Sequence, residues 1–336
     1  MADKFFIPAG YSPALSLRET QHAIKFIKDT FQQTLSFAVT LDRVTAPLIV
    51  RSGNGINDDL NGVERKVGFD MNVDMGEAEV VQSLAKWKRL ALYRYGYRVG
   101  EGIYTDMNAI RRDDKVDNVH SIFVDQWDWE KVITREQRNV DFLKETVRSI
   151  VKAIAYVKRQ VTLRYPMLDA PICDEPFFIT TQELKDLYPD VDARERERLI
   201  TKAKKTVFLM QIGKKLDNGE PHDGRAPDYD DWELNGDILF WDEVLDDSLE
   251  ISSMGIRVDE KSLASQLKEA GAEDRMQHDY HKMIANGTLP LTIGGGIGQS
   301  RLCMLMLEKA HIGEVQSSVW PKSMVETCEK NGINLL

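Results

Sequence analysis

The amino-acid sequence predicts a single domain of the α/β class, α+β in type, in which helices flank a central and mostly antiparallel β-sheet. Strand-like segments between residues 206 and 257 follow one another with no helical pattern between them, which favours antiparallel pairing. Long amphipathic segments elsewhere predict the flanking helices. The 336 residues show no repeat, no low-complexity linker and no break in composition, so we expect one domain over residues 1–336.

The first predicted element is an amphipathic helix over residues 15–37. Ser16 and Glu19 form a capping box, and apolar side chains recur at helical spacing from Ile24 to Leu35. Residues 41–62 then turn to β-branched side chains, are interrupted by Pro47 and end in a polar Gly/Asn/Asp loop. A long helix beside such a strand also suits the edge of a homodimer.

The remaining elements follow from the same signals. A short helix carries Lys86, Lys88 and Arg89, cations that usually sit in water, and a strand ends at Arg111. Thr180 and Glu183 cap a further helix. The link from Asp231 to Asn235 is only Trp-Glu-Leu, which predicts a truncated lid there. The other expected elements are strands at residues 117–130, 206–212, 236–241 and 249–259, helices at 139–160, 193–205 and 260–286, and a strand running into a helix from residue 292.

Composition restricts the partners of this chain. The net charge of −10 and pI near 5.3 argue against a broad nucleic-acid surface, because such surfaces depend on Lys and Arg to neutralise phosphates. The N-terminus has no signal-like apolar segment, and no apolar run approaches the ~20 residues of a membrane span. Three cysteines without C-x-x-C spacing suggest neither a disulfide framework nor a thiolate zinc site, so we expect a cytoplasmic protein. The charge and the lack of long apolar runs lead us to expect no nucleic-acid or membrane partner.

A glycine-rich stretch, "TIGGGIGQSRL" at residues 292–302, suggests a nucleotide site. It lacks both the third glycine of a dinucleotide-binding turn and the lysine of a P-loop. Gly294, Gly296 and Gly298 alternate along one strand face, which leaves that face bare for a flat ring, and Arg301 follows in the first turn of a helix. A tight strand-to-helix joint in a packed core is the alternative.

Alternation in "VDQWDWEKV" separates two strand faces. Gln126, Asp128 and Glu130 share one face, and Trp127 and Trp129 share the other, because successive strand side chains point in opposite directions. The tryptophans should cover the core and the polar trio should line a cleft, unless this face is simply the solvated side of a sheet.

Charged residues elsewhere predict a phosphate and magnesium site. Arg111 closes an apolar strand, where its planar fork can meet a phosphate. Asp237 and Glu250 begin adjacent apolar strands, and Mg²⁺ is usually held by one or two carboxylates together with substrate phosphates. Turn chemistry alone is the alternative for the acidic stretch around Asp228 and Asp230.

Taken in order, these segments resemble the three motifs of class II aminoacyl-tRNA synthetases. The helix and proline-bearing strand of residues 16–50 resemble the first, "AIRRDDKVDNVHSIFVDQWDWE" the second and the glycine–arginine stretch the third. The arginine of the second is followed by Arg112 and Asp113 instead of the usual R-x-E. The match narrows to the ammonia-dependent aspartate–ammonia ligases, whose blocks resemble "NDDLNGVE", "VVQSLAKWKR", "GEGIYTDMNAIR", "RAPDYDDW", "NGDIL" and "SSMGIRVD" over nearly the whole chain.

This resemblance implies ATP-dependent synthesis of asparagine from aspartate and ammonia, through a β-aspartyl adenylate, with AMP and pyrophosphate released. It implies a synthetase-like fold, ATP as co-substrate, Mg²⁺ and a homodimer. Residues implied around aspartate and asparagine are Asp58, Lys88, Gln126, Asp128, Asp230, Ser253 and Arg257, of which Asp58 is the candidate to deprotonate ammonium. Residues implied at ATP and its magnesium are Arg111, Asp237, Glu250, Ser252, Gly296, Gly298 and Arg301, with Asp237 and Glu250 on the metal.

Three alternatives stay open. An aspartyl- or asparaginyl-tRNA synthetase would share the catalytic core but needs an anticodon-binding domain, for which no segment is visible. A glutamine-dependent amidotransferase needs a cysteine nucleophile, in one class at position 2, which is Ala2 here. A non-catalytic synthetase-like sensor is expected to lose an ATP arginine, whereas Arg111 and Arg301 are both present.

Overall fold

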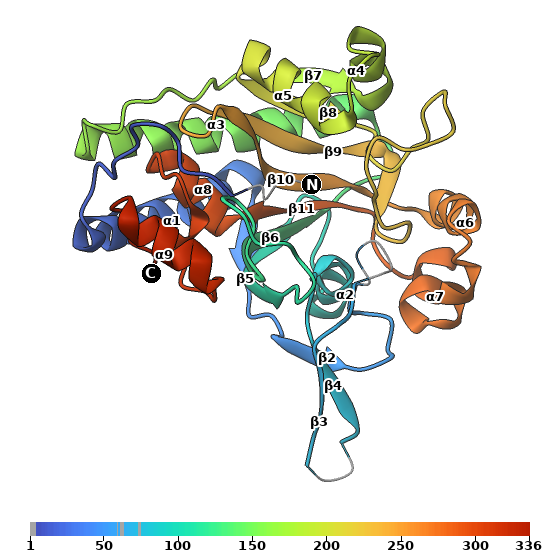
Figure 1. The fold of residues 1–336 in the computed structure, drawn as a ribbon. Helices are drawn as coiled ribbons and strands as arrows, with labels where there is room; N and C mark the ends of the chain where they lie inside the picture. Colours follow the sequence, from blue (N-terminus) through green and yellow to red (C-terminus); the bar gives the residue numbers. More distant parts are fainter. Residues whose placement is uncertain (1–4, 59, 61–63, 73–74) are drawn as a thin grey trace.

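An eight-stranded sheet forms the centre of the molecule in the computed structural model, which describes residues 5–58, 60, 64–72 and 75–336 (Figure 1). Its strand order is β1-β5-β6-β11-β10-β9-β8-β7, with antiparallel pairing everywhere except at the two edge pairs, β1 with β5 and β7 with β8. Its strands are β1 Leu41–Arg43, β5 Gly102–Ile110, β6 Phe123–Val132, β7 Phe177–Thr180, β8 Thr206–Met210, β9 Asp230–Asp242, β10 Asp247–Arg257 and β11 Thr292–Gly298. The predicted mostly antiparallel sheet is confirmed.

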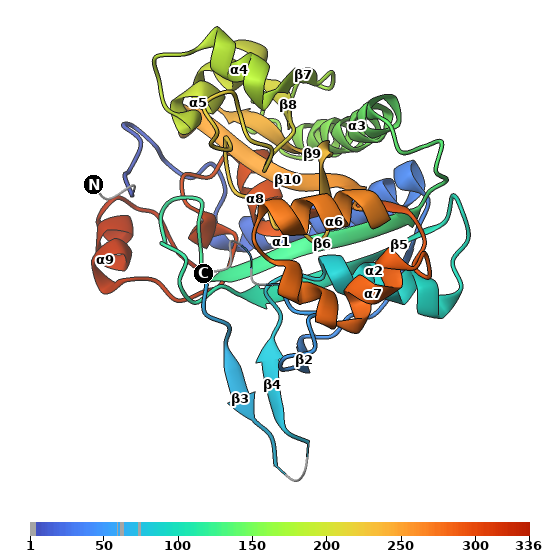
Figure 2. The ribbon, with the colours of Figure 1, turned by 90° about the vertical axis from the view of Figure 1, so that its right-hand side faces the viewer.

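A second, three-stranded sheet projects away from the first (Figures 1 and 2). It consists of β2 Ile49–Arg51, β3 Gly68–Asp70 and β4 Glu77–Val80 in the order β2-β4-β3. Part of the polar loop predicted after Pro47 belongs to this region, and its Asp59 and residues 61–63 lie outside the described residues.

Helices cover the main sheet on both faces, as Figure 2 shows with α6 and α7 in front of it and α3 behind. The helices are α1 Leu17–Val39, α2 Ala85–Tyr95, α3 Val140–Arg164, α4 Thr181–Leu187, α5 Ala193–Lys204, α6 Glu260–Glu269, α7 Asp279–Ala285, α8 Gln299–Met306 and α9 Lys322–Lys330, with short 3₁₀ turns η1 Glu273–Gln277 and η2 Ile312–Glu314. Both predicted capping boxes are present, at Ser16 before α1 and at Thr180 before α4.

The main core lies between the sheet and the helices α1, α3 and α8. Trp127 and Trp129 of β6 are fully buried there, and the Phe31 ring of α1 lies 4.8 Å from that of Trp127, centroid to centroid. Burying both indole rings on one face of β6 turns Gln126 and Asp128 to the opposite face. The alternation predicted from "VDQWDWEKV" is therefore confirmed.

Three element predictions are wrong, each for a local reason. The helix predicted over residues 260–286 is broken into α6, η1 and α7, because Gly271 adopts a left-handed φ of +65° that ends α6. The strand predicted over residues 117–130 begins only at Phe123, because Asp117 accepts hydrogen bonds from the backbone of Val119 and His120 and holds a turn. The link from Asp231 to Asn235, where a truncated lid was expected, is part of the continuous strand β9.

Candidate functional site

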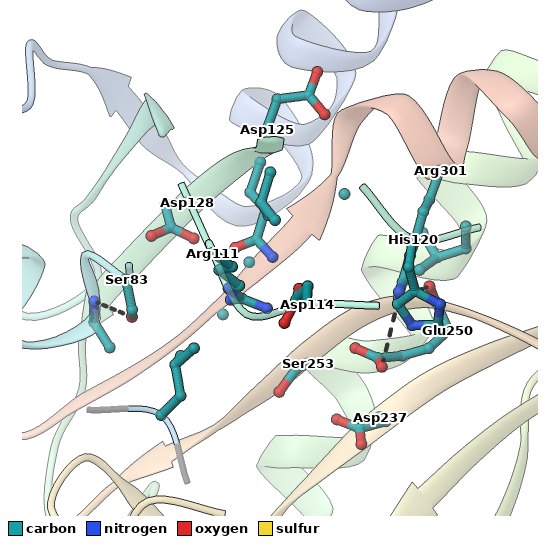
Figure 3. A pocket seen from close by; sticks show the side chains of 18 of the residues that line it. Ser83, Arg111, Asp114, His120, Asp125, Asp128, Asp237, Glu250, Ser253 and Arg301 are labelled. Atoms are coloured by element: carbon teal, nitrogen blue, oxygen red, sulfur yellow. Dashed lines mark hydrogen bonds and ion pairs between the residues drawn. The ribbon is translucent and has the colours of Figure 1, made fainter. Parts of the chain in front are cut away.

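A cavity of about 520 Å³ opens over the face of β6, β11 and β10 that points away from the main core. Figure 3 shows Asp128 of β6, Ser253 and Glu250 of β10 and Asp237 of the neighbouring strand β9 around the same space as Arg111 and Arg301. All the residues implied at the substrates line this cavity except Asp58 and Ser252; those that line it are Lys88, Arg111, Gln126, Asp128, Asp230, Asp237, Glu250, Ser253, Arg257, Gly296, Gly298 and Arg301. The fold thus brings together residues separated by more than half of the chain.

The glycines of β11 make room for polar side chains of the neighbouring strand β6. Gly294 pairs with Glu130, Gly296 with Asp128 and Gly298 with Gln126. A Cβ on Gly296 would stand 2.3 Å from the Gln126 Oε1 atom and 2.6 Å from the Asp128 Oδ1 atom, both impossibly short. At Gly298 the nearest atom would be the Arg301 Cβ atom, at 3.4 Å. The bare strand face predicted for a flat ring is therefore already occupied beside Gly294 and Gly296 and remains open at Gly298.

Arg257 of β10 is fixed at the base of the cavity by two carboxylates. Its Nη2 donates to the Glu130 Oε2 atom at 2.8 Å and its Nη1 donates to Asp230. The Thr292 hydroxyl also donates to the Glu130 carboxylate at 2.7 Å. Burial opposes the charges, but the ion pairs dominate, so the pKa of Arg257 is raised and the pKa of Glu130 is lowered. Arg257 is held in one orientation, with its charge shared between Glu130 and Asp230.

Lys86, Lys88 and Arg89 of α2 are buried, contrary to the expectation that such cations sit in water. The Lys88 Nζ atom donates to the Gly295 carbonyl oxygen at 2.9 Å and lies 3.4 Å from the Asp128 Oδ2 atom. Burial lowers the pKa of Lys88, while the charge of Asp128 opposes that change. Arg89 instead donates to the carbonyl oxygens of Val258 and Pro290. Lys88 is therefore a cation of the cavity, whereas Arg89 ties α2 to the strands.

Two arginines enter the cavity from different elements (Figure 3). Arg111 directly follows β5, and its buried Nε atom has no hydrogen-bond partner among the described residues. Arg301, in the first turn of α8, donates to the carbonyl oxygens of Glu250 at 3.0 Å and Val119 at 3.3 Å. Both guanidinium groups face a polar cavity, which suits the recognition of an anion such as phosphate.

Asp237 and Glu250 lie on the adjacent strands β9 and β10 and point into the same region (Figure 3). The sequence analysis expected both residues to begin their strands, but both lie within them. Burial raises the pKa of Asp237 to about 7, the Arg225 charge opposes this rise, and the Glu250 charge adds to it. Two carboxylates that repel each other suit a divalent cation, whose charge would relieve the repulsion.

The described residues contain no cluster of three or more His, Cys, Asp or Glu side chains able to hold a metal ion by themselves. Two carboxylates, such as Asp237 and Glu250, are the number that magnesium usually takes from a protein when substrate phosphates and water supply its other ligands. Arg225, which bonds to Asp237, was not singled out from the sequence. It lies in the block "RAPDYDDW", but no spacing rule marked it.

Ser252 and Asp58 are the predicted residues whose side chains do not line the cavity. A β-bulge between Glu250 and Ser252 puts Ser252 out of step with its neighbours, so its buried hydroxyl does not face the cavity and has no described hydrogen-bond partner. Asp58 is also buried, one layer behind the wall formed by Leu60 and Tyr229.

Asp58 belongs to a group of ionisable residues, all buried except the partly buried Arg275, that we call the Asp58 cluster: Asp58, Lys86, Asp228, Arg275 and His281. The Asp228 Oδ2 atom lies 2.7 Å from the Lys86 Nζ atom and 2.9 Å from both the Arg275 Nη1 and the His281 Nε2 atoms. Burial raises the pKa of Asp58 to about 6, opposed by Lys86 and assisted by Asp228. The Asp58 Oδ2 atom accepts no hydrogen bond from the described residues.

Comparison with known proteins identifies relatives over the whole chain. A family model described as "AsnA: Aspartate-ammonia ligase" matches residues 18–332. The aspartate–ammonia ligase of Clostridium tetani is 57% identical over 336 residues, which cover 100% of this chain and 98% of that protein. The enzyme of the same name from Lactobacillus acidophilus is 57% identical over 335 residues, covering 99% and 100% of the two chains.

Solved structures share the fold at low sequence identity. The asparaginyl-tRNA synthetase of Entamoeba histolytica in complex with asparaginyl-adenylate superposes with a TM-score of 0.66 at 13% identity, over 89% of this chain and 66% of that one. The asparaginyl-tRNA synthetase of Pyrococcus horikoshii complexed with asparaginyl-adenylate gives a TM-score of 0.61 at 17% identity, over 95% and 76% of the chains. The predicted class II synthetase-like fold is confirmed.

Proposed function

We propose the following roles for the residues of the cavity. The premise is that this chain belongs to the aspartate–ammonia ligase family, whose enzymes make asparagine from aspartate and ammonia with ATP. The observation that supports a role for the cavity is the convergence of Arg111, Arg301, Lys88 and two carboxylates, Asp237 and Glu250, on one polar space. That set suits a triphosphate and an amino acid better than it suits an apolar ligand.

In the first step, a β-carboxylate oxygen of aspartate attacks the α-phosphorus of ATP, and the bond from that phosphorus to the bridging oxygen of pyrophosphate breaks. Two anions must approach each other, so the cations Arg111, Lys88 and Arg301 lower the barrier by compensating the charge that develops. The product is β-aspartyl adenylate. When bound by Asp237, Glu250 and the phosphates, Mg²⁺ would supply a Lewis acid that neutralises the leaving pyrophosphate.

In this step, aspartate would lie between Arg257 and Asp128. The fixed guanidinium of Arg257 would meet the α-carboxylate, and Asp230 would accept hydrogen bonds from the α-ammonium group. Ser253 and Gln126 line the same part of the cavity, where they can hydrogen-bond to the substrate. Gly298, whose pocket side is open, would leave space for the adenine ring beside Arg301.

In the second step, the nitrogen of ammonia attacks the carbonyl carbon of the adenylate and the bond to AMP breaks. Ammonia arrives mostly as ammonium at neutral pH, so a carboxylate must accept a proton. We assign this role to Asp58, whose pKa of about 6 is close to the working pH of a general base. The proton released by ammonium would reach the Asp58 carboxylate by passing Leu60 and Tyr229, the residues that separate Asp58 from the cavity.

The test of this function is aspartate-dependent ATP–pyrophosphate exchange, followed by AMP formation when ammonium is added. We expect exchange without ammonium, and equal amounts of AMP and asparagine with it. The same assay is run with tRNA and with glutamine as the nitrogen donor. A requirement for tRNA, or a preference for glutamine over ammonium, would replace this proposal by one of the alternatives left open by the sequence.

We also propose that the single domain of residues 1–336 works as a homodimer in the cytoplasm. Apolar side chains along the predicted interface are exposed in the isolated chain: Phe37 is 92% exposed, Leu48 56% and Ile49 43%. Such a surface marks a protein-binding site. The proposed location rests on a different observation. The free thiols of this chain, Cys173, Cys303 and Cys328, suit a reducing compartment such as the cytoplasm. In the described part of the chain, no helix is both long and apolar enough to span a membrane. A stable, active monomer in analytical sedimentation would refute the dimer.

A further inference from the structure

Arg225 occupies a central position in the cavity, in the irregular segment between β8 and β9. Its Nη2 atom donates to the Asp237 Oδ1 atom at 2.5 Å, its Nη1 atom donates to the Ser253 hydroxyl, and its Nε atom lies 3.9 Å from the Asp230 Oδ2 atom. The side chain is only 10% exposed. One guanidinium group therefore contacts a proposed magnesium ligand and approaches the proposed partner of the substrate ammonium.

These contacts conflict with the arrangement that the reaction requires. An Asp237 carboxylate that accepts a hydrogen bond from Arg225 is a weaker ligand for a divalent cation, because the guanidinium and the metal ion would repel each other at close range. The same reasoning applies more weakly to Asp230 and an incoming ammonium group. Arg225 therefore competes with magnesium for Asp237, and binding of magnesium and ATP favours its departure from that carboxylate.

The surroundings of Arg225 allow such a movement. The segment that carries it is outside regular secondary structure, and Gly213 in the same segment has a left-handed φ of +90° and leaves room that a Cβ atom, 2.8 Å from the Arg225 Cβ atom, would fill. The Arg225 Nε atom is buried without a hydrogen bond to any residue described. Arginine has five N–H donors in a planar fork that matches a phosphate, and ATP would place phosphates next to Asp237.

We propose that Arg225 is a substrate-binding residue that changes partners: it neutralises Asp237 in the free enzyme, yields that carboxylate to the metal when magnesium–ATP enters, and then donates to a phosphate oxygen of the nucleotide. This proposal rests on the proposed function, in which Asp237 holds the metal. It predicts opposite effects of one substitution on two equilibria: Arg225 weakens binding of the metal alone and strengthens binding of the metal–nucleotide complex.

The first measurement is isothermal titration of the free enzyme with Mn²⁺ as the probe, in the absence of nucleotide. Replacing Arg225 by glutamine frees Asp237, so Arg225→Gln should bind Mn²⁺ about tenfold more tightly than the unmodified chain, the effect of losing one charged competitor. The gain should vanish in Arg225→Gln/Asp237→Asn. Lys214→Gln is the matched control, because it removes the same charge from the same segment but outside the cavity, where Lys214 pairs with Glu233.

The second measurement is the affinity of the same proteins for magnesium–ATP by equilibrium dialysis. Arg225→Gln should bind it about tenfold more weakly, and Lys214→Gln should match the unmodified chain. Arg225→Lys keeps a charge that competes for Asp237 but loses the planar fork. Arg225→Lys should therefore bind Mn²⁺ like the unmodified chain and bind magnesium–ATP more weakly than the unmodified chain does. Normal Mn²⁺ binding by this variant would also show that its weaker magnesium–ATP binding is not due to misfolding.

Unchanged or weaker Mn²⁺ binding by Arg225→Gln would overturn the competition at Asp237. Tighter Mn²⁺ binding with unchanged magnesium–ATP binding would overturn the transfer to phosphate. Neither measurement requires asparagine to be made. A chain that lacks aspartate-dependent exchange would refute the proposed function, while both binding equilibria could still be read.

Discussion

The strand wall of the cavity, made by the pocket faces of β6, β11 and β10, and the Asp58 cluster, which lies behind Leu60 and Tyr229, place polar groups by different means. On the strand wall, pairing fixes each position: Gly296 faces Asp128, and Ser253 faces both Gly296 and Asp237. In the Asp58 cluster, Asp228 collects a lysine from α2, an arginine from η1 and a histidine from α7. These elements are joined by no common ladder of hydrogen bonds.

Because of this difference, the two regions should be sensitive to different kinds of substitution. The wall depends on the exact fit of side chains across two strands, so small additions there should disturb it. The Asp58 cluster depends on balanced charge in a buried place, so changes of protonation should disturb it more than changes of shape. The proposed functions differ in parallel, with phosphate chemistry at the wall and proton transfer at Asp58.

The largest expected effect is kinetic and separates the two regions. Asp58→Asn keeps the shape of Asp58 but removes its proton acceptor, so asparagine formation should fall by about 10²–10⁴-fold while pyrophosphate exchange largely persists. A higher pH supplies more free ammonia and should restore part of the lost rate. Both reactions are measured over a pH series on one preparation. An equal fall in both, without rescue at high pH, would leave Asp58 a binding or structural residue and make Asp128 the next candidate for the base.

The second prediction concerns the wall side alone. Arg111→Ala and Arg301→Ala should each lower aspartate-dependent exchange by about 10²–10³-fold, the usual effect of removing one donor from a developing charge. Arg112→Ala is the control for Arg111, since Arg112 follows it in sequence and lies outside the cavity lining. Near-normal exchange in Arg111→Ala would contradict its assignment to the α-phosphate.

A third prediction tests the fit between β6 and β11. Gly296→Ala forces a Cβ atom onto Gln126 and Asp128, so unfolding by urea should show a loss of about 1–3 kcal/mol. Gly298→Ala is the matched control, because its Cβ atom would stand 3.4 Å from the nearest side-chain atom, and its loss should be clearly smaller. Equal losses would show that room for these side chains does not require the glycine.

The smallest expected effect concerns charge in the Asp58 cluster. The folded-state pKa of Asp58, about 6, exceeds its ordinary value of 3.8, so the folded state binds this proton more tightly than the unfolded state does. Stability should therefore fall as pH rises from about 4 to about 6, and above that range Asp58→Asn should be more stable than the unmodified chain by about 3 kcal/mol, or a few degrees in Tm.

Thermal unfolding at pH 4 and pH 8 checks this stability difference. The gain from Asp58→Asn should be present at pH 8 and small at pH 4, where Asp58 is protonated in the folded state. Asp70→Asn, on the exposed strand β3, is the control with no expected pH-dependent gain. A gain that is the same at both pH values would indicate a change in packing and not in charge.

Regular elements and their facing were predictable because they depend on local periodicity. Alternation alone separated Trp127 and Trp129 from Gln126 and Asp128, and capping chemistry alone located the starts of α1 and α4. The breaks were harder to predict, since Gly271 ends a helix only through the backbone conformation that it adopts. The sequence resemblance supplied most of the cavity residues, which no spacing rule could have brought together.

The sequence by itself determined the antiparallel sheet, the polar face of β6 and the alternating glycines of β11, because each is written in the spacing of neighbouring residues. Only the tertiary structure decided that those glycines accommodate Gln126, Asp128 and Glu130, that Lys86 and Lys88 are buried, and that Arg225 reaches Asp237. These facts depend on contacts between residues distant in the chain, where burial and charge set each group's partners. Local sequence encodes which face a side chain takes, but the partner it meets there comes from another element of the fold.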